Sequence, residues 1–428
     1  MYLKDDELRM LEGGEGELRQ EAMRFLVRLG EFYGAKEMVD IGFAFCYVTN
    51  QTEGLSGLPR SIDTELLMRA VEEGVKVKVP TIGGLGGVDP DIWQEMKIPE
   101  EEYRKYLHET EIECKLGIAP VATCTPYMVT DMNQVPFGTH MCTIESSAIP
   151  FYNSVLGARV ERSGISSFFA ALTGKYPAIG YHLDENRYAN VLIRVDCELK
   201  NFTDFGALGL FAGEICGMDV PVFGGIAKAT MPELIALSSA IATGGAVSLF
   251  HIPGITPEFA SVEDALHGKE PKKTVVFGEK ELASIYARFH GEEGEKVDTV
   301  LVGCPHYSLY QLRGVAERLE GKRVAPEVSL IMSTAPQTKF MAEQMGYVKT
   351  INDAGGMLIS RTCPIISAGC PGPVYSYTHP DYTTGTLVTD SLKVASYAMS
   401  TLSARKIILA DSDSCFEAAL TGVWGGQK

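Results

Sequence analysis

Apolar and polar residues follow two different periods along this chain, and these periods predict helices and strands in turn. Residues 5–34 carry apolar side chains at helical spacing, with an interruption at Gly13 and Gly14. Residues 37–49 form an apolar run typical of a strand. The same order then repeats with a helix at 62–74, a strand at 76–81, a helix at 98–117 and a strand at 119–124. Such alternation indicates a largely parallel sheet.

The polar segment 261–274, which contains glycine and proline, is the best candidate for a domain boundary. After it the alternation resumes, with strands at 298–303, 327–334, 356–362 and 405–411 and helices at 307–321, 338–347 and 414–422. We therefore predict an α/β protein with mainly parallel sheets. An N-terminal α/β region of one or two subdomains spans 1–262, a C-terminal α/β domain spans 275–428, and the active site lies between them.

Length and composition limit the class of protein. The 428 residues are 45% apolar with a mean hydropathy of +0.03, which suits about two to three domains with real cores. A net charge of −17 and a pI near 5.0 argue against nucleic acid or an anionic membrane as a partner. No apolar run approaches the ~18–20 residues of a membrane span, and the charged N-terminus lacks a signal core. We expect a soluble, cytoplasmic protein.

Three cysteines follow apolar runs that are typical of strands: Cys124, Cys304 and Cys363. Ligands of open α/β sheets bind beyond the carboxyl ends of strands, so these thiols predict a shared site. Three thiolates around one open position suit an iron–sulfur cluster or a catalytic metal. The alternative is three buried, inert cysteines. The ten cysteines are spread over a long chain with no export signal, which favours reduced thiols over disulfides.

Other polar segments allow both a functional and a structural interpretation. The glycine-rich segment 81–89 is either an anion cradle or a tight turn. The segment 182–187 suits a solvated turn, and 145–148 suits a helix cap. We expect His306 to orient its loop and not to bind a metal. The roles of Cys142 and Cys370 are left open. Five other cysteines fit ordinary packing positions as small apolar residues: Cys46, Cys114, Cys197, Cys216 and Cys415.

Several blocks of sequence, taken together and in order, resemble the aconitase X family. They are TCTPY at 123–127, ESSA at 145–148, NSVLGAR at 153–159, HLDENR at 182–187, HIPGITPE at 251–258, GCPHYSL at 303–309 and TCP at 362–364. The resemblance continues to CFEAALTGVW at 415–424 and so covers nearly the whole chain. It is specific because several blocks recur in the same order.

The resemblance implies an aconitase-like catalytic region of stacked α/β/α units, with the small swivel domain absent from this chain. It implies the large subunit of an iron–sulfur-dependent hydro-lyase, with a small swivel-domain subunit as partner. Known activities of the family are the dehydration of cis-3-hydroxy-L-proline and of mevalonate 5-phosphate. Cys124, Cys304 and Cys363 match the family blocks that carry the cluster ligands. The resemblance leaves the type of cluster open between [4Fe–4S], [3Fe–4S] and [2Fe–2S]. The alternative is a cluster-binding regulatory subunit without dehydratase activity.

Dehydration requires a Lewis acid on the leaving hydroxyl and groups that move protons. The candidate catalytic residues are Glu145, Ser146, Asp184 and Glu185 of the matching blocks, and Lys393 of TDSLK at 389–393, which resembles a polar C-terminal block of the family. The candidate substrate-binding residues are Asn153, Arg159 and Arg187 of the matching blocks, Ser391 of TDSLK, and Thr81 at the start of the segment 81–89. The guanidinium groups of Arg159, Arg162 and Arg187 suit a carboxylate or phosphate, so the expected substrate is a small hydroxy acid or phosphorylated hydroxy acid.

The chain departs from the family pattern in blocks that would grip a substrate. The segment 81–89 reads TIGGLGGVD where the family usually has TTLNP followed by Gly-x-Asp. The segment 128–136 lacks the usual glycine–asparagine pair, and 41–49 lacks the usual histidine. These differences do not affect the predicted cluster ligands, but they leave the identity of the substrate undecided.

Overall fold

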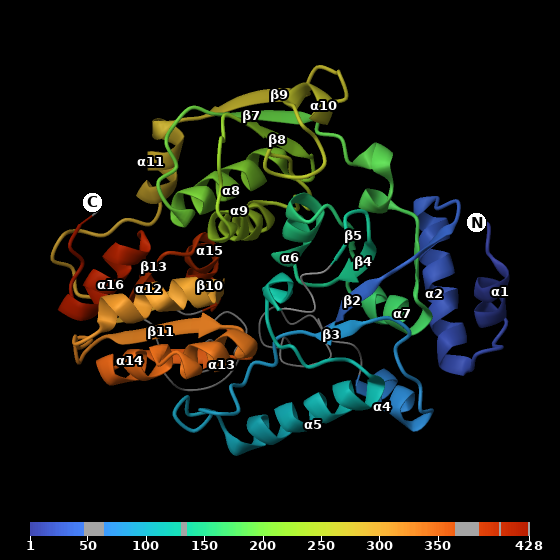
Figure 1. Cartoon of the computed structure of the whole chain (residues 1–428), viewed down its shortest axis with the longest axis horizontal. Coiled ribbons are helices and arrows are strands. Elements are labelled where there is room, and N and C mark those ends of the chain that lie inside the picture. The colour runs from blue at the N-terminus through green and yellow to red at the C-terminus, as the bar shows by residue number, and fades with distance from the viewer. Residues whose placement is uncertain (47–63, 130–134, 364–384, 402–403, 427–428) are drawn as a thin grey trace.

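Three parallel sheets occupy three separate parts of the molecule (Figure 1). The structure, a computed structural model, describes residues 1–46, 64–129, 135–363, 385–401 and 404–426. Every strand pair within these sheets is parallel, as the strand–helix alternation predicts. The mixed α/β class with mainly parallel sheets is thereby confirmed.

The first part contains a four-stranded sheet of order β3-β2-β4-β5 and a small antiparallel pair, β1-β6. The predicted N-terminal helix is divided at the glycine pair into α1 and α2. The elements are α1 (Asp5–Leu11), α2 (Glu17–Tyr33), β1 (Met38–Asp40), β2 (Phe43–Cys46), α4 (Thr64–Glu72), β3 (Thr81–Gly83), α5 (Glu100–Leu116), η1 (Pro126–Met128), β4 (His140–Thr143), α6 (Ala148–Pro150), η2 (Phe151–Val155), β5 (Arg159–Arg162), α7 (Ser166–Thr173), β6 (Lys175–Pro177), η3 (Gly180–His182) and η4 (Asp184–Asn186).

Two predicted strands of this part are shorter than expected. The predicted strand 76–81 forms regular structure only from Thr81 onward, as β3. The predicted strand 119–124 contributes a single parallel bridge between Ala119 and Ile82. Cys124 therefore follows an extended segment at the edge of the sheet and not a full strand.

The second part has a three-stranded sheet of order β8-β7-β9, with two helices beside it, α8 with glycines at 206, 209 and 213, and α9 (Figure 1). A Cβ atom on Gly209 or Gly213 would lie 2.6 Å or 2.5 Å from a carbonyl oxygen of α9, so glycine lets α8 and α9 touch. The elements are β7 (Val191–Val195), α8 (Phe202–Cys216), β8 (Pro221–Gly224), α9 (Met231–Gly244), α10 (Val262–Ala265), β9 (Lys273–Phe277) and α11 (Glu279–Ala287).

The third part has a five-stranded sheet of order β12-β11-β10-β13-β14. The segment 261–274, which the sequence predicts as a domain boundary, leads into β9, and β9 still pairs with β7 of the second sheet. The elements are β10 (Thr299–Tyr307), α12 (Leu309–Leu319), β11 (Ser329–Thr334), α13 (Pro336–Gln344), α14 (Tyr347–Ala354), β12 (Met357–Ser360), β13 (Gly385–Thr389), α15 (Leu392–Thr401), β14 (Ala404–Leu409) and α16 (Ser412–Thr421).

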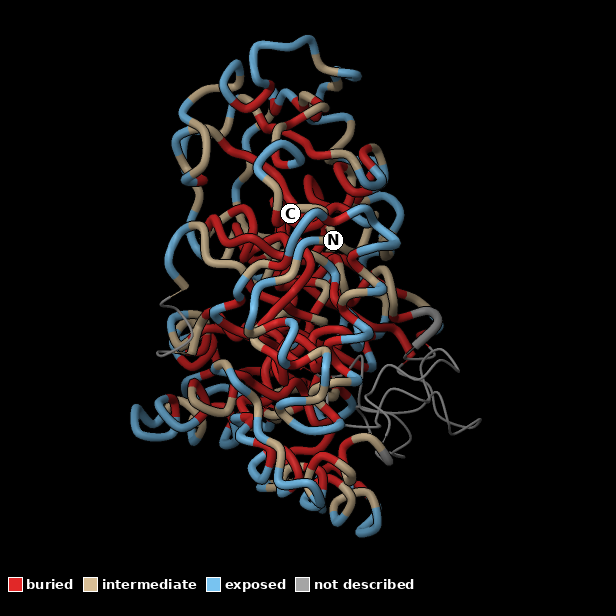
Figure 2. The backbone as a smooth tube through the Cα atoms, turned by 90° about the vertical axis from the view of Figure 1, so that its right-hand side faces the viewer, coloured by how far each residue is buried: buried red, intermediate tan, exposed pale blue. Residues whose placement is uncertain are grey.

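The buried backbone gathers in the middle of the molecule (Figure 2), and one apolar cluster draws residues from all three parts. One continuous apolar cluster includes Phe45 of β2, Leu208 of α8 and Leu392 of α15. The same cluster contains Cys124, whereas the cores beneath α2 and around β11 are separate. The three parts therefore share one apolar core, and this core contains the three candidate cysteines.

Candidate active site

Cys304 lies in a bulge near the carboxyl end of β10. The pairing of β10 with β11 shifts register between Val302 and Tyr307, which releases the intervening residues from the ladder. Gly303 has a φ of +83°, and a Cβ atom there would lie 2.4 Å from the Ser333 carbonyl oxygen. Only glycine fits both constraints, and the resulting bend carries Cys304 out of the sheet.

His306 ties the loops of the three candidate cysteines together. Its Nε2 lies 3.0 Å from the carbonyl oxygen of Thr362, next to Cys363, and its Nδ1 lies 2.9 Å from Thr123 Oγ1, next to Cys124. Its backbone N–H donates to the Cys124 sulfur at 3.5 Å. Because a carbonyl only accepts, Nε2 carries the proton and the Thr123 hydroxyl donates to Nδ1. Both ring nitrogens are engaged, so His306 orients these loops.

The three cysteines are buried and lie within electrostatic range of one another. Their exposed fractions are 5%, 8% and 6% for Cys124, Cys304 and Cys363. Burial raises the pKa of the Cys124 thiol well above its usual range, with further contributions from Glu145 and the other two cysteines. Burial also raises the pKa of Cys304, while Lys393 acts in the opposite direction. All three are free of disulfides.

No three His, Cys, Asp or Glu side chains among the described residues are arranged to hold a single metal ion. An iron–sulfur cluster makes a different demand, because each thiolate binds its own iron atom and the sulfurs stay apart. Three buried thiols outside disulfides, on three separate loops and with a lysine beside them, fit such a cluster by the chemistry of the donor set.

Glu145 and Lys393 form a buried ion pair beside the cysteines. Lys393 Nζ lies 3.5 Å from Glu145 Oε1, and the side chains are 15% and 7% exposed. Burial disfavours the Lys393 ammonium, but Glu145 and the three cysteines outweigh it, so the pKa of Lys393 is raised. Ser147 donates to the same Glu145 oxygen from its backbone N–H at 3.1 Å and from its hydroxyl at 2.6 Å. Ser147 therefore fixes the carboxylate, whereas no hydrogen bond from its side chain caps α6.

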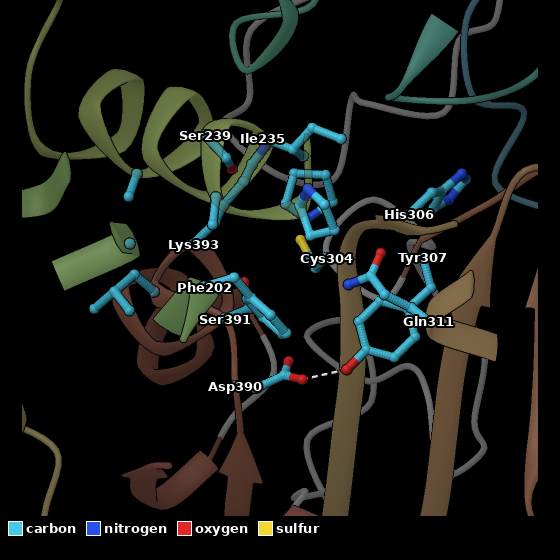
Figure 3. A pocket seen from close by; sticks show the side chains of 16 residues that line it. Phe202, Ile235, Ser239, Cys304, His306, Tyr307, Gln311, Asp390, Ser391 and Lys393 are labelled. Atoms are coloured by element: carbon cyan, nitrogen blue, oxygen red, sulfur yellow. Dashed lines mark hydrogen bonds between the residues drawn. The ribbon is translucent and has the colours of Figure 1, made fainter. Parts of the chain in front are cut away.

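A cavity of about 30 Å³ is lined in part by Cys304 and has room for about one or two water molecules (Figure 3). Ser391, Lys393, His306 and Ser239 are among the residues that line it. Ser239 Oγ is buried and has no hydrogen-bond partner among the described residues. The cavity is too small for a hydroxy acid.

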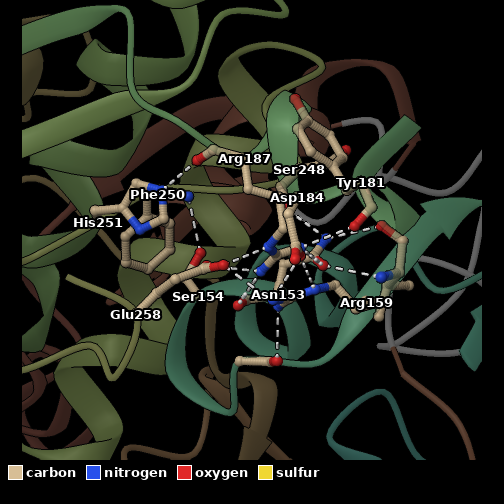
Figure 4. Close-up of polar contacts among 12 residues, drawn as sticks. Asn153, Ser154, Arg159, Tyr181, Asp184, Arg187, Ser248, Phe250, His251 and Glu258 are labelled. Carbon is tan, nitrogen blue, oxygen red and sulfur yellow. Dashed lines mark hydrogen bonds and ion pairs between the residues drawn. The ribbon is translucent and has the colours of Figure 1, made fainter. Parts of the chain in front are cut away.

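A second cluster contains most of the predicted substrate-binding residues (Figure 4). Arg187 is fully buried, and its Nε and Nη2 donate to Glu258 at 2.7 Å and 2.9 Å. Its other N–H groups donate to Asn153 and to the Tyr181 carbonyl. Arg159 donates to Asp184 at 3.0 Å and also contacts Glu258 at 3.3 Å. Both guanidinium groups are thus engaged inside the protein.

This second cluster lies at the opposite end of the strands from Glu145. Arg159 pairs with His140 at the start of β4, whereas Glu145 follows the last residue of that strand, Thr143. Five residues of extended chain span on the order of 15 Å. The structure brings Cys124, Cys304, Cys363, Glu145, Ser146, Ser391 and Lys393 to one end, and leaves Asn153, Arg159, Asp184 and Arg187 at the other.

The remaining candidates have simple surroundings. Asp184 and Glu185 are exposed on a turn, as the solvated-turn interpretation of 182–187 expects. Thr81 is buried at the start of β3, and its hydroxyl donates to the Val79 carbonyl. The catalytic and substrate-binding roles assigned from the sequence stay predictions. Cys370 and residues 130–134 lie outside the described residues.

The glycine-rich segment 81–89 packs against α5. A Cβ atom on Gly83 would lie 2.2 Å from Glu113 Oε1, and one on Gly86 would lie 2.2 Å from the Tyr106 ring. Asp89 then accepts from Lys339 Nζ at 2.9 Å and from the Ser360 backbone N–H at 2.7 Å. These contacts favour a packing role over an anion cradle. They also join the first part to β12, which precedes Cys363.

Comparison with known proteins assigns the family. Models of the aconitase X first, second and third domains match residues 1–185, 189–287 and 297–421. The chain belongs to the aconitase X family. The resemblance seen in the sequence is therefore confirmed across nearly the whole chain.

Named relatives of this aconitase X chain are dehydratases. The phosphomevalonate dehydratase large subunit of Methanosarcina mazei is 35% identical over 86% of this chain and 87% of that protein. The cis-3-hydroxy-L-proline dehydratase of Pseudomonas aeruginosa is 31% identical over 96% of this chain and 69% of that protein. Dehydratases are hydro-lyases, so the prediction of an enzyme of this class is confirmed.

The fold comparison agrees with the family. Thermococcus kodakaraensis aconitase X, solved in its holo form, has a TM-score of 0.81 and 32% identity, covering 98% of this chain and 100% of that chain. The described part of this aconitase X chain contains no helix long and apolar enough to cross a membrane.

Proposed function

We propose that this chain is the large subunit of an iron–sulfur-dependent hydro-lyase that dehydrates a small hydroxy acid or a phosphorylated hydroxy acid. The observation that carries the proposal is the convergence of three buried thiols on the Glu145–Lys393 pair. The named activities of the aconitase X relatives support the reaction class. The site draws on both 1–262 and 275–428, in line with an active site between these regions.

Cys124, Cys304 and Cys363 would hold the cluster. When bound, the cluster would supply a Lewis acid for the leaving hydroxyl. His306 keeps the three loops in place through its two ring nitrogens. The residues fit the group because thiols on separate loops bind separate iron atoms.

Glu145 and Lys393 would handle protons beside the bound substrate. The raised pKa of Lys393 keeps its ammonium charged 3.5 Å from Glu145 Oε1, and the Glu145 carboxyl would accept or return the proton. Ser147 fixes the position of Oε1 through two hydrogen bonds. Burial of this pair keeps bulk water away and strengthens its electrostatic effect.

The proposal includes a small partner subunit that covers the site. Relatives named as large subunits support it. Ser147 is committed to Glu145, so its hydroxyl is not positioned as an independent base. We expect the isolated chain to turn over at least about a hundredfold more slowly than the pair, which is the usual scale of a missing acid or base.

Anaerobic purification tests the proposal. The protein should contain iron and acid-labile sulfide, and replacing Cys124, Cys304 or Cys363 by alanine should each remove most of both. Cys415→Ala is the matched control, because Cys415 is also buried and free but belongs to the separate core around β11. Equal iron in all four variants would exclude these cysteines as ligands.

Turnover is tested on the pair, by screening hydroxy acids for the absorbance of a new C=C bond. Dehydration of one of them by the pair supports the enzyme. A pair that keeps its cluster and dehydrates none of them would favour a regulatory subunit. Full-rate dehydration by the single chain, with no small subunit detected by mass spectrometry, would remove the partner from the proposal.

A further inference from the structure

We infer that Arg162 binds the carboxylate or phosphate of the substrate, in place of Arg159 and Arg187. This inference rests on the proposed function, because it assigns the anion contact of the same site. It follows from the position, the orientation and the free donors of the Arg162 guanidinium. None of these three properties is shared by the other two arginines.

Arg162 is at the correct end of its strand. β5 runs parallel to β4, and Arg162 pairs with Thr143, the last residue of β4. The Thr143 hydroxyl accepts from the Glu145 backbone N–H at 3.2 Å, so Arg162 and Glu145 emerge at the same edge of the sheet. Arg159, three residues earlier, marks the opposite edge.

Arg162 also projects from the correct face of the sheet. Side chains alternate along a strand, so Arg162 shares a face with Val160 and not with Glu161. Val160 belongs to the central cluster that contains Cys124, Cys304 and Cys363. Glu161 points the other way and accepts from the Tyr181 backbone N–H at 3.1 Å.

The Arg162 guanidinium has donors to offer. It is exposed, and within the described part of the chain its side chain makes no hydrogen bond and no ion pair. It lies within electrostatic range of Glu145 and of Tyr397 on α15, the helix that carries Lys393. A planar fork of free N–H groups matches a carboxylate or a phosphate bidentately.

The charge of the site calls for such a cation. Lys393 is paired with Glu145, and the candidate cluster ligands are anionic as thiolates. An anionic substrate approaching this edge would meet a net negative charge without a further positive group. Arg162 supplies that charge from the solvent side, where the substrate enters, while Glu145 and Lys393 lie deeper.

Binding of inorganic phosphate to the reconstituted pair tests the inference independently of turnover. Titrations followed by ³¹P NMR should show saturable binding to wild type, and Arg162→Gln should weaken it about ten- to a hundredfold, the value of one charge-assisted contact. Arg162→Lys should restore part of the affinity because it keeps the charge. Arg194→Gln, at an exposed strand position in β7, is the control and should bind phosphate as wild type does.

Kinetics separate this inference from the proposed function. With a hydroxy acid that the pair dehydrates, Arg162→Gln should raise KM about ten- to a hundredfold and leave kcat within a few-fold, because the contact is remote from the reacting bond. Unchanged iron and sulfide in Arg162→Gln would show that the cluster is intact. Equal phosphate binding by wild type and Arg162→Gln, or no binding by either, overturns the role of Arg162. A pair that binds phosphate through Arg162 but dehydrates no acid instead overturns the proposed function alone.

Discussion

At the scale of single residues, Arg187 illustrates how a charged side chain is kept without water. Two of its nitrogens face Glu258, and the others face Asn153 and a carbonyl, so its donors all have acceptors. Asn153 in turn donates to the carbonyls of Val160 and Ser248. The cluster therefore fixes the amino end of β5 against the second part of the molecule.

Removing Arg187 should cost stability more than substrate binding. Arg187→Met leaves the largely buried Glu258 with only its 3.3 Å contact to Arg159, which should cost about 3–5 kcal/mol, measured by urea unfolding. Arg288→Gln breaks the exposed pair with Glu214 and should cost no more than about 1 kcal/mol. If Arg187→Met has normal stability and loses only substrate affinity, Arg187 binds the substrate anion and its structural role is wrong.

At the scale of elements, α5 explains the unusual glycines of 81–89. The Tyr106 ring and the Glu113 carboxyl of α5 fill the space that side chains at Gly86 and Gly83 would need. Burial, with a contribution from Glu109, raises the pKa of Glu113 well above its usual range, which favours its protonated form. A protonated carboxyl is the form that packs against a glycine backbone at the lowest desolvation cost.

Gly86→Ala should destabilise the protein by about 1–3 kcal/mol, because the new methyl group overlaps the Tyr106 ring. Gly224→Ala in β8, whose Cβ atom would meet its nearest neighbour at an ordinary 3.7 Å, is the control. Thermal unfolding of Gly86→Ala, Tyr106→Ala and the double variant should show a smaller loss in the double variant than the sum of the two. Strict additivity would show that Tyr106 is not the group in contact.

At the scale of the whole molecule, neutral histidines buried in the first and second parts connect stability to pH. Burial, followed by the neighbouring His140 and arginines, lowers the pKa of His182 to about 3. Burial lowers the pKa of His251 to about 4, against the opposing hydrogen bond to the Arg187 carbonyl. The folded protein therefore resists protonation that the unfolded chain accepts below about pH 6.5.

Stability should fall as the pH falls below about 6.5, because the unfolded state then binds more protons. At pH 5 each such histidine lowers the free energy of unfolding by about 2 kcal/mol relative to pH 8. Urea unfolding at both pH values should show this loss in wild type and a smaller loss in His182→Gln and His251→Gln. The exposed His290→Gln is the control and should match wild type. Identical pH dependence in all four proteins would contradict the burial of these rings as neutral species.

Much of this protein was determined by the sequence alone. The alternation of periods predicts parallel sheets, since apolar spacing reflects which faces are buried locally. The glycine pair at 13 and 14 predicts the break between α1 and α2, and the ordered blocks around Cys124, Cys304 and Cys363 identify the family. These features depend on neighbouring residues or on strings that can be read directly.

Only the tertiary structure decided which polar residues share a site. Arg159 and Arg162 are three residues apart in one strand, yet strand register places them at opposite ends of the sheet. Arg187 looks available in the sequence but is enclosed by Glu258, which lies 71 residues away. The role of the glycines in 81–89 likewise depends on α5. Register, burial and long-range pairing arise from the packing of distant segments, so they cannot be predicted from local patterns of sequence.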